Sequence, residues 1–200
     1  MKKLVLILFI LLLASASGQC LALVKSYFGL KTGINYAIFD PDDEAGNFTG
    51  VGLGIGLGLG IDILNTLDLE FAPSFRTTSF NRTVINIQHG ANYTNFYLPF
   101  ELKLKAGMLP VVNPYFGLGF AENIQLSGEA YIGEVKTEID ELENDLFLLF
   151  SLGADISFIK LKISPDFTFN LNLSADDPDT QNRSEKNYEI NFAVGIYYTP

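Results

Sequence analysis

The sequence predicts an all-β chain that forms an eight-stranded antiparallel up-and-down transmembrane β-barrel. Three observations lead to this prediction. Apolar and polar residues alternate with a two-residue period in eight segments, which is typical of strands with two different faces. The connections between these segments are alternately long and short. Hydrophobic residues make up 48% of the chain, yet after the N-terminus no apolar run is long enough for a membrane-spanning helix.

The first 22 residues have the composition of a secretory signal peptide, so the barrel domain is predicted over residues 23–200. Lys2 and Lys3 precede ten apolar residues, Leu4–Leu13, and small residues follow at two possible cleavage sites. Ten apolar residues are too few for a membrane anchor. Cys20 lacks the flanking residues that lipoprotein acylation needs. Cleavage would remove two lysines, so the net charge of −10 would become −12.

Each predicted strand is longer than the usual five or six residues of a soluble sheet. The clearest alternation lies in the fourth strand, where Phe96, Leu98 and Phe100 share one face and Tyr97 and Glu101 share the other. In chain order the predicted strands are Tyr27–Phe39, Gly50–Asp62, Leu67–Thr78, Tyr93–Lys105, Asn113–Ile124, Phe147–Ile159, Leu161–Ser174 and Tyr188–Tyr198.

Long and short connections alternate between these strands, so all long connections are predicted at one end of the barrel. The long ones are Asp40–Thr49, Ser79–Asn92, Gln125–Leu146 and Ala175–Asn187, and the short ones are Leu64–Thr66, Ala106–Val112 and Ile159–Lys160. Outer-membrane barrels have this asymmetry, with short periplasmic turns and longer external loops. Together the long connections carry most of the negative charge of the chain.

The composition of the two faces favours a membrane barrel over a soluble ligand-binding barrel of the periplasm, which is the alternative. The less apolar face is rich in Gly, Ser, Thr and Asn, and the alternate glycines of Gly50–Asp62 suit a narrow barrel interior. Aromatic residues near the strand ends predict two girdles at the membrane interfaces. The predicted girdles are Tyr36, Phe39, Phe80, Tyr93, Phe96, Phe147, Phe167, Phe169 and Tyr188 at the long-loop end, and Tyr27, Phe28, Tyr115, Phe116, Phe158, Tyr197 and Tyr198 at the short-turn end.

Four segments carry a resemblance to a known family: Tyr27–Asn35, Phe96–Lys103, Asn113–Gly119 and Ala193–Tyr198. Over the whole mature chain this organisation resembles the small outer-membrane β-barrel proteins of Gram-negative bacteria, especially the PorT-like group of Bacteroidetes-type organisms and the OmpA-like transmembrane domain. The resemblance implies localisation in the cell outer membrane. It also implies that the barrel-assembly machinery reads the last strand, although Thr199 and Pro200 follow the final aromatic residue here.

Charged residues on the polar face predict a charge network inside the barrel. An unpaired buried charge costs several kcal/mol, so we expect these groups to pair and to plug the interior. An ion pathway is the alternative. The predicted members are Lys31, Arg76, Lys103, Lys105, Lys162, Asp62, Asp68, Glu70, Glu101, Asp155, Asp166 and Glu189.

The long connections hold acidic clusters that an external protein or a divalent cation could bind. Oxygen-rich loops suit Ca²⁺ or Mg²⁺, but the first cluster lacks the spacing of a calcium loop, so we expect a solvated surface. The acidic residues are Asp40, Asp42, Asp43 and Glu44 in the first long connection, Glu129, Glu134, Glu138, Asp140, Glu141, Glu143 and Asp145 in the third, and Asp176, Asp177 and Asp179 in the fourth.

The sequence predicts a non-enzymatic protein without a cofactor, a resident metal or a nucleic-acid partner. The glycines of Gly50–Gly60 follow strand spacing and lack the lysine of a phosphate loop, and an acidic chain is a poor nucleic-acid binder. His89 with Ser79 is the one route to a lipid-modifying hydrolase, and no local motif surrounds it. We therefore expect a structural or surface-interaction role in the outer membrane, with a small passive channel or that hydrolase as alternatives.

Overall fold

The fold is described by a computed structural model over residues 24–40, 47–85, 87–106, 111–139, 144–174 and 186–200. The predicted signal peptide lies outside these residues and stays a prediction. The strands are β1 (Val24–Asp40), β2 (Phe48–Ile63), β3 (Leu67–Phe71), β4 (Ser74–Val84), β5 (Ile87–Lys105), β6 (Val112–Ile132), β7 (Val135–Glu138), β8 (Asn144–Phe158), β9 (Leu161–Asn172) and β10 (Lys186–Tyr198).

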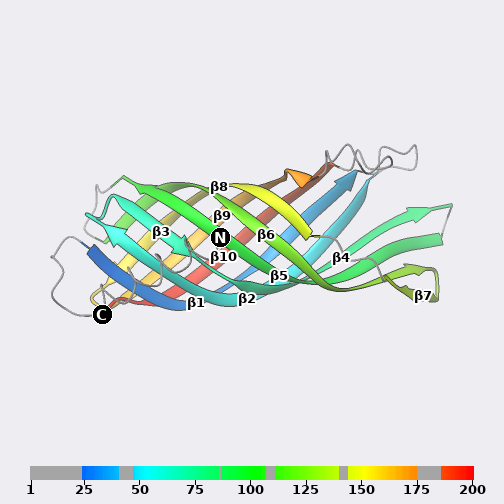
Figure 1. The fold of residues 1–200 in the computed structure, drawn as a ribbon, viewed down its shortest axis with the longest axis horizontal. Helices are drawn as coiled ribbons and strands as arrows, with labels where there is room; N and C mark the ends of the chain where they lie inside the picture. The colour runs from blue at the N-terminus through cyan, green and yellow to red at the C-terminus, as the bar shows by residue number, and fades with distance from the viewer. Residues whose placement is uncertain (1–23, 41–46, 86, 107–110, 140–143, 175–185) are drawn as a thin grey trace.

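The strands form one antiparallel sheet that closes on itself, which confirms the predicted fold (Figure 1). The ring runs β1, β2, β3 with β4, β5, β6, β8, β9 and β10, and β10 pairs back to β1. Paired residues traced around the ring from Tyr27 return to β1 at Ala37, ten residues further along. A shear of this size in an eight-position ring corresponds to strands tilted by about 40° from the barrel axis.

The count of ten strands differs from the predicted eight for two local reasons. The third ring position is divided at Ala72 and Pro73, because proline has no N–H for the ladder. Two backbone hydrogen bonds continue the sheet across this break. Leu57 N donates to Pro73 O at 3.0 Å, and Ala72 N donates to Pro99 O at 3.3 Å. The other additional strand, β7, folds back on the end of β6 and pairs only with it among the described residues.

The second long connection, Ser79–Asn92, was predicted as a loop, and this prediction is wrong. β4 continues to Val84 and β5 starts at Ile87, so the segment is a hairpin that is paired almost to its tip. The hairpin of β6 and β7 lies beside it, and both extend past the rest of the barrel at the right of Figure 1. The outer face of this extension carries polar residues, such as Ser79, Asn81 and Thr83 on β4, so it lacks the apolar outer face that marks the other strands.

The outer wall of the ring is an apolar band. On β2, every second residue from Val51 to Ile63 is Val, Leu or Ile, and Leu53 is 66% exposed. A strand tilted by about 40° advances about 2.5 Å per residue along the barrel axis, so this stretch covers about 30 Å. That height matches the hydrocarbon core of a bilayer.

No described residue belongs to a helix that is long and apolar enough to cross a membrane.

The predicted aromatic girdles need a correction, because several of their members point into the barrel. Tyr27, Tyr115, Tyr197 and Phe147 are buried on the inner wall. The two-residue period already implied this for Tyr27, which shares its face with Lys31. Phe28, Phe116, Phe158 and Tyr198, in contrast, are exposed on the outer wall, as predicted.

Candidate functional site: a charge network inside the barrel

All twelve charged residues singled out in the sequence lie on the inner wall of the barrel. Ten of them form two groups in the half with the short turns. We name Asp62, Asp68, Lys105, Asp155 and Lys162 the mouth cluster, and Lys31, Glu70, Glu101, Lys103 and Asp166 the inner cluster. Arg76 and Glu189 form a separate pair nearer the long hairpins.

The mouth cluster is built around the ammonium group of Lys105. Its Nζ atom lies 2.6 Å from Asp62, 2.9 Å from Asp68 and 2.6 Å from Asp155. Lys162 adds a second ammonium group, 3.3 Å from Asp68 and 3.6 Å from Asp155. The three carboxylates come from β2, β3 and β8, so these contacts join strands that are distant in the sequence.

The three aspartates of the mouth cluster are also the one group in the described part of the chain with the spacing of a metal site. One oxygen of each lies within 4.8 Å of the others. Lys105 touches all three, however, and so holds the position that a bound cation would take. The lysine supplies the positive charge that these carboxylates require.

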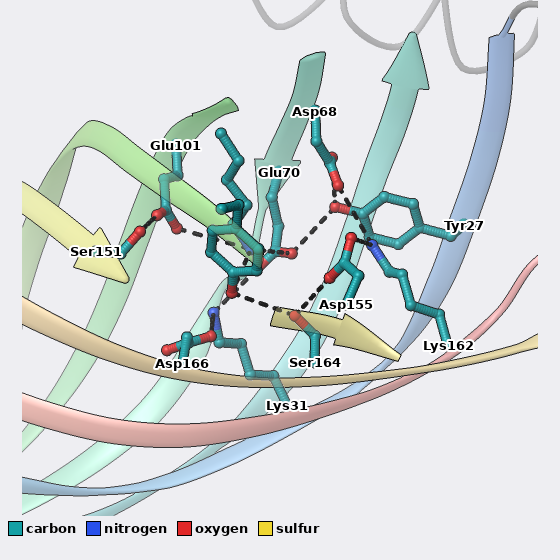
Figure 2. A network of polar contacts seen from close by, with 12 residues as sticks. Tyr27, Lys31, Asp68, Glu70, Glu101, Ser151, Asp155, Lys162, Ser164 and Asp166 are labelled. Atoms are coloured by element: carbon teal, nitrogen blue, oxygen red, sulfur yellow. Dashed lines mark hydrogen bonds and ion pairs between the residues drawn. The ribbon is translucent and has the colours of Figure 1, made fainter. Parts of the chain in front are cut away.

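The inner cluster is buried more deeply. Glu70 accepts from Lys103 at 2.8 Å and from Lys31 at 2.9 Å, and Lys31 lies 2.7 Å from Asp166. The side chain of Lys103 is completely buried. Glu101 lies 3.9 Å from Lys103 and also accepts a hydrogen bond from Ser151 of β8. Figure 2 shows these groups converging from the strands of opposite walls.

Buried hydroxyl groups join the two clusters, and the sequence-based interpretation missed them. Tyr27 OH donates to Asp68 at 2.7 Å and lies 3.0 Å from Glu70, so it connects the mouth cluster to the inner cluster (Figure 2). Ser164 donates to Asp155 at 2.8 Å, and its Oγ atom lies 3.2 Å from Tyr115 OH. The ammonium of Lys162 sits 3.0 Å from the centre of the Tyr27 ring, a cation–π contact.

A second polar layer lies above the inner cluster. The guanidinium of Arg76 lies 3.4 Å from the centre of the Tyr97 ring and 3.3 Å from Glu189. Asn170 donates to Glu189 at 2.8 Å and to Tyr97 OH at 3.1 Å. Between this layer and the inner cluster is a cavity of about 50 Å³, which Lys31, Arg76, Glu101 and Asp166 help to line and which has room for a few water molecules.

The alternate glycines of β2 make room for the buried aromatic rings. A Cβ atom at Gly60 would overlap the Tyr27 ring, and one at Gly58 would overlap the Tyr197 ring. A Cβ atom at Gly54 would instead meet the flexible Arg76 side chain at 3.1 Å. The glycine pattern therefore belongs to interior packing, which agrees with rejecting it as a phosphate loop.

Gly60→Ala is expected to lower the free energy of unfolding by about 1–3 kcal/mol, because the buried Tyr27 ring has to move and its two carboxylate contacts are disturbed. Gly54→Ala is the matched control on the same strand and should lose less than about 1 kcal/mol. Urea titration of the protein folded in lipid vesicles, followed by gel migration with and without boiling, measures both. Equal losses for the two variants would contradict the assigned packing.

The residues considered for hydrolase chemistry are not brought together. Ser79 on β4 is hydrogen-bonded to Asn92, whereas His89 on β5 is paired with Arg82. Ser79 and Arg82 are three residues apart on one strand, so Ser79 and His89 project from opposite faces of the sheet. The prediction that His89 lies in a loop is also wrong, since it belongs to β5.

The acidic connections are described only in part. Glu129 pairs with Lys136 at 2.7 Å, and Asp145 accepts from Asn172 at 2.9 Å. Glu134 and Glu138 are exposed. The remaining acidic positions fall outside the described residues or have side chains outside the description: Asp40, Asp42, Asp43, Glu44, Asp140, Glu141, Glu143, Asp176, Asp177 and Asp179.

Comparison with known proteins supports the fold. The profile of the outer membrane protein beta-barrel domain family matches residues 7–199. Neisserial surface protein A has a similar structure, with a TM-score of 0.51 at 11% identity over 86% of this chain and 96% of that one. The outer membrane protein OprG from Pseudomonas aeruginosa has a TM-score of 0.50 at 13% identity over 89% of this chain and 97% of that one. No curated protein matches the sequence.

Proposed function

Because the chain belongs to the outer membrane protein beta-barrel domain family, we propose that it is a non-enzymatic surface protein whose barrel is a closed scaffold. The outer membrane is its location. The observation that carries the proposal is the paired interior: ammonium groups meet carboxylates at 2.6–2.9 Å across the lumen, and buried tyrosines fill the space between them. Such an interior holds opposite walls together and leaves little room for solutes.

The long hairpins and the acidic connections then face the outside of the cell, as in outer-membrane barrels with short periplasmic turns. They would present the chain to an external protein or to a cation. The proposal also includes cleavage of the signal peptide and recognition of β10 by the barrel-assembly machinery. The four segments that resemble the PorT-like group support placing the chain in that group.

A closed scaffold predicts no steady ion current. In a planar lipid bilayer at neutral pH, the purified protein should give no stepwise openings, because the mouth cluster, the inner cluster and the Arg76–Glu189 pair lie in series along the lumen. A wide-pore porin in the same chamber is the positive control. Reproducible openings of the unmodified protein would favour the alternative of a small passive channel.

The hydrolase alternative is tested on the lipids of intact cells. The lipid A profile of a strain that carries His89→Ala should match that of the parent, since Ser79 and His89 lie on opposite faces. A lipid A species that disappears with His89→Ala would overturn the non-enzymatic proposal. Recovery of the protein from the soluble fraction, without a heat-dependent gel shift, would instead favour the soluble periplasmic barrel.

A further inference from the structure

The tips of the two long hairpins form an apolar cluster far from the lipid-facing band. Val84 pairs with Ile87, Ile132 pairs with Val135, and Gly133 N donates to Gln88 O at 2.8 Å, so the two tips lie side by side. His89 pairs with Ile132 and shares a face with Ile87, so Ile87, Ile132 and Val135 lie on one face, and Ile85 lies in the turn between β4 and β5. Its most exposed members are Ile85 at 91%, Val135 at 69%, Ile132 at 57% and Ile87 at 48%.

This cluster lies too far from the barrel's own membrane to be covered by it. On β5 the lipid-facing residues end at Phe96, and Ile87 lies nine residues further along the strand. At about 2.5 Å per residue along the axis, the tip stands about 20 Å beyond the apolar band. Single exposed apolar residues are ordinary on protein surfaces, but a contiguous cluster marks a contact site.

The backbone at the tip shows that the apolar side chain is held at a conformational cost. Ile85 has φ of 49°, a left-handed conformation in which a β-branched residue is a genuine outlier and which Gly or Asn adopts more easily. Leu64 and Ile159 also have positive φ, but both lie in short turns directly beside the lipid-facing band. Lipid of the resident membrane can cover those two residues and cannot reach Ile85.

Composition and charge indicate what would cover the tip. Protein contact sites concentrate binding energy in Trp, Tyr and Arg, whereas this cluster consists of Val and Ile, which suits a fluid apolar medium better than a shaped protein pocket. The described charges around it are slightly acidic, with Arg82 and Lys136 against Glu129, Glu134 and Glu138. A slightly acidic surrounding disfavours contact with anionic lipid and is compatible with zwitterionic headgroups, which carry no net charge.

We propose that this apolar tip inserts into the surface of a second bilayer with zwitterionic headgroups, so that the protein joins the outer membrane to another membrane. The proposal rests on the surface orientation given above and names the class of partner. The tips of the two adjacent hairpins project beyond the rest of the barrel, so they can reach the boundary between headgroups and acyl chains of a facing bilayer. Because each molecule inserts few side chains, firm attachment depends on many copies acting together.

The sequence contains no Trp, so a single introduced Trp reports on the tip alone. The full-length protein with Ile85→Trp, held in a Trp-free amphipol, is mixed with phosphatidylcholine vesicles. The emission should shift to shorter wavelength, and bromine-labelled phosphatidylcholine should quench it. Gln88→Trp is the matched control, because Gln88 is exposed on the opposite face of the same hairpin; its emission should remain that of an indole in water.

A binding measurement completes the test. The unmodified protein should float with phosphatidylcholine vesicles, and the variant with Ser at Ile85, Ile87, Ile132 and Val135 should bind at least ten-fold more weakly. The exchange of Thr83 and Gln88 for Ser should leave binding unchanged, and the heat-dependent gel shift verifies folding of every variant. Absence of binding, binding to anionic vesicles only, or equal binding of the Ser variant would overturn the proposal.

The orientation on which the proposal rests is tested separately. A cysteine introduced at Gln88 should react with an impermeant thiol reagent on intact cells. No labelling there would contradict the proposed surface function, whereas labelling without vesicle binding would contradict the lipid-contact proposal alone.

Discussion

Lys103→Met should lower the free energy of unfolding by about 3–5 kcal/mol, the loss expected when one partner of a buried ion pair is removed. The Lys103 side chain is completely buried, and its ammonium lies 2.8 Å from Glu70 and 3.9 Å from Glu101. Methionine keeps most of the side-chain volume but removes the positive charge that stabilises the buried carboxylates of Glu70 and Glu101. Urea titration of the protein folded in lipid vesicles measures the loss.

The exposed pair of Lys136 and Glu129 provides the control. It has a similar separation of 2.7 Å, but the Lys136 side chain is 64% exposed, so Lys136→Met should change stability by less than about 1 kcal/mol. The double variant Lys103→Met with Glu70→Gln should recover part of the loss, because the two residues are coupled. Equal effects of Lys103→Met and Lys136→Met would show that the inner cluster is not buried as described.

Leu57→Arg should destabilise the folded barrel by about 2–4 kcal/mol, the expected penalty for arginine near the bilayer midplane. Leu57 is the middle residue of the seven outward-facing positions from Val51 to Ile63 and is 57% exposed. In a soluble barrel an arginine at such an exposed position would be tolerated. The same urea titration measures the effect of the substitution.

Asn81→Arg is the matched control for depth. Asn81 is exposed, pairs with Thr49 of β2 and lies above the apolar band, so its replacement should cost no more than about 1 kcal/mol. A Leu57→Arg variant as stable as Asn81→Arg would contradict the assignment of the outer wall to lipid.

The sequence predicted the barrel well because successive side chains of a strand point to opposite faces, so the apolar outer face and the polar inner face appear as a two-residue period. That period also predicts the inner positions of the charged residues. Its interruptions predict the short turns at Leu64–Thr66 and Ile159–Lys160. The extension of β4 and β5 was missed, since its outer face is polar and lacks the apolar residues that mark the lipid-facing side of the other strands. Tyr27, Tyr115 and Tyr197 were assigned to the outer aromatic girdle because they lie near strand ends. The two-residue period already places them on the inner face, where the structure has them.

The apolar tip also escaped prediction. Ile85, Ile87, Ile132 and Val135 belong to two connections that are distant in the sequence, and each connection alone shows one or two ordinary aliphatic residues. Pairing of β5 with β6 brings them together. A cluster made of residues from several strands leaves no local pattern that a reading along the chain could detect.

The sequence by itself determined which residues face lipid and which face the interior, because the alternation of side chains is a property of one strand. Only the tertiary structure decided which charges meet. Lys105 reaches Asp62, Asp68 and Asp155 because a shear of ten residues brings particular positions of β2, β3, β5 and β8 to the same height. That height depends on the pairing register of every strand in the closed ring, and no single strand contains this information.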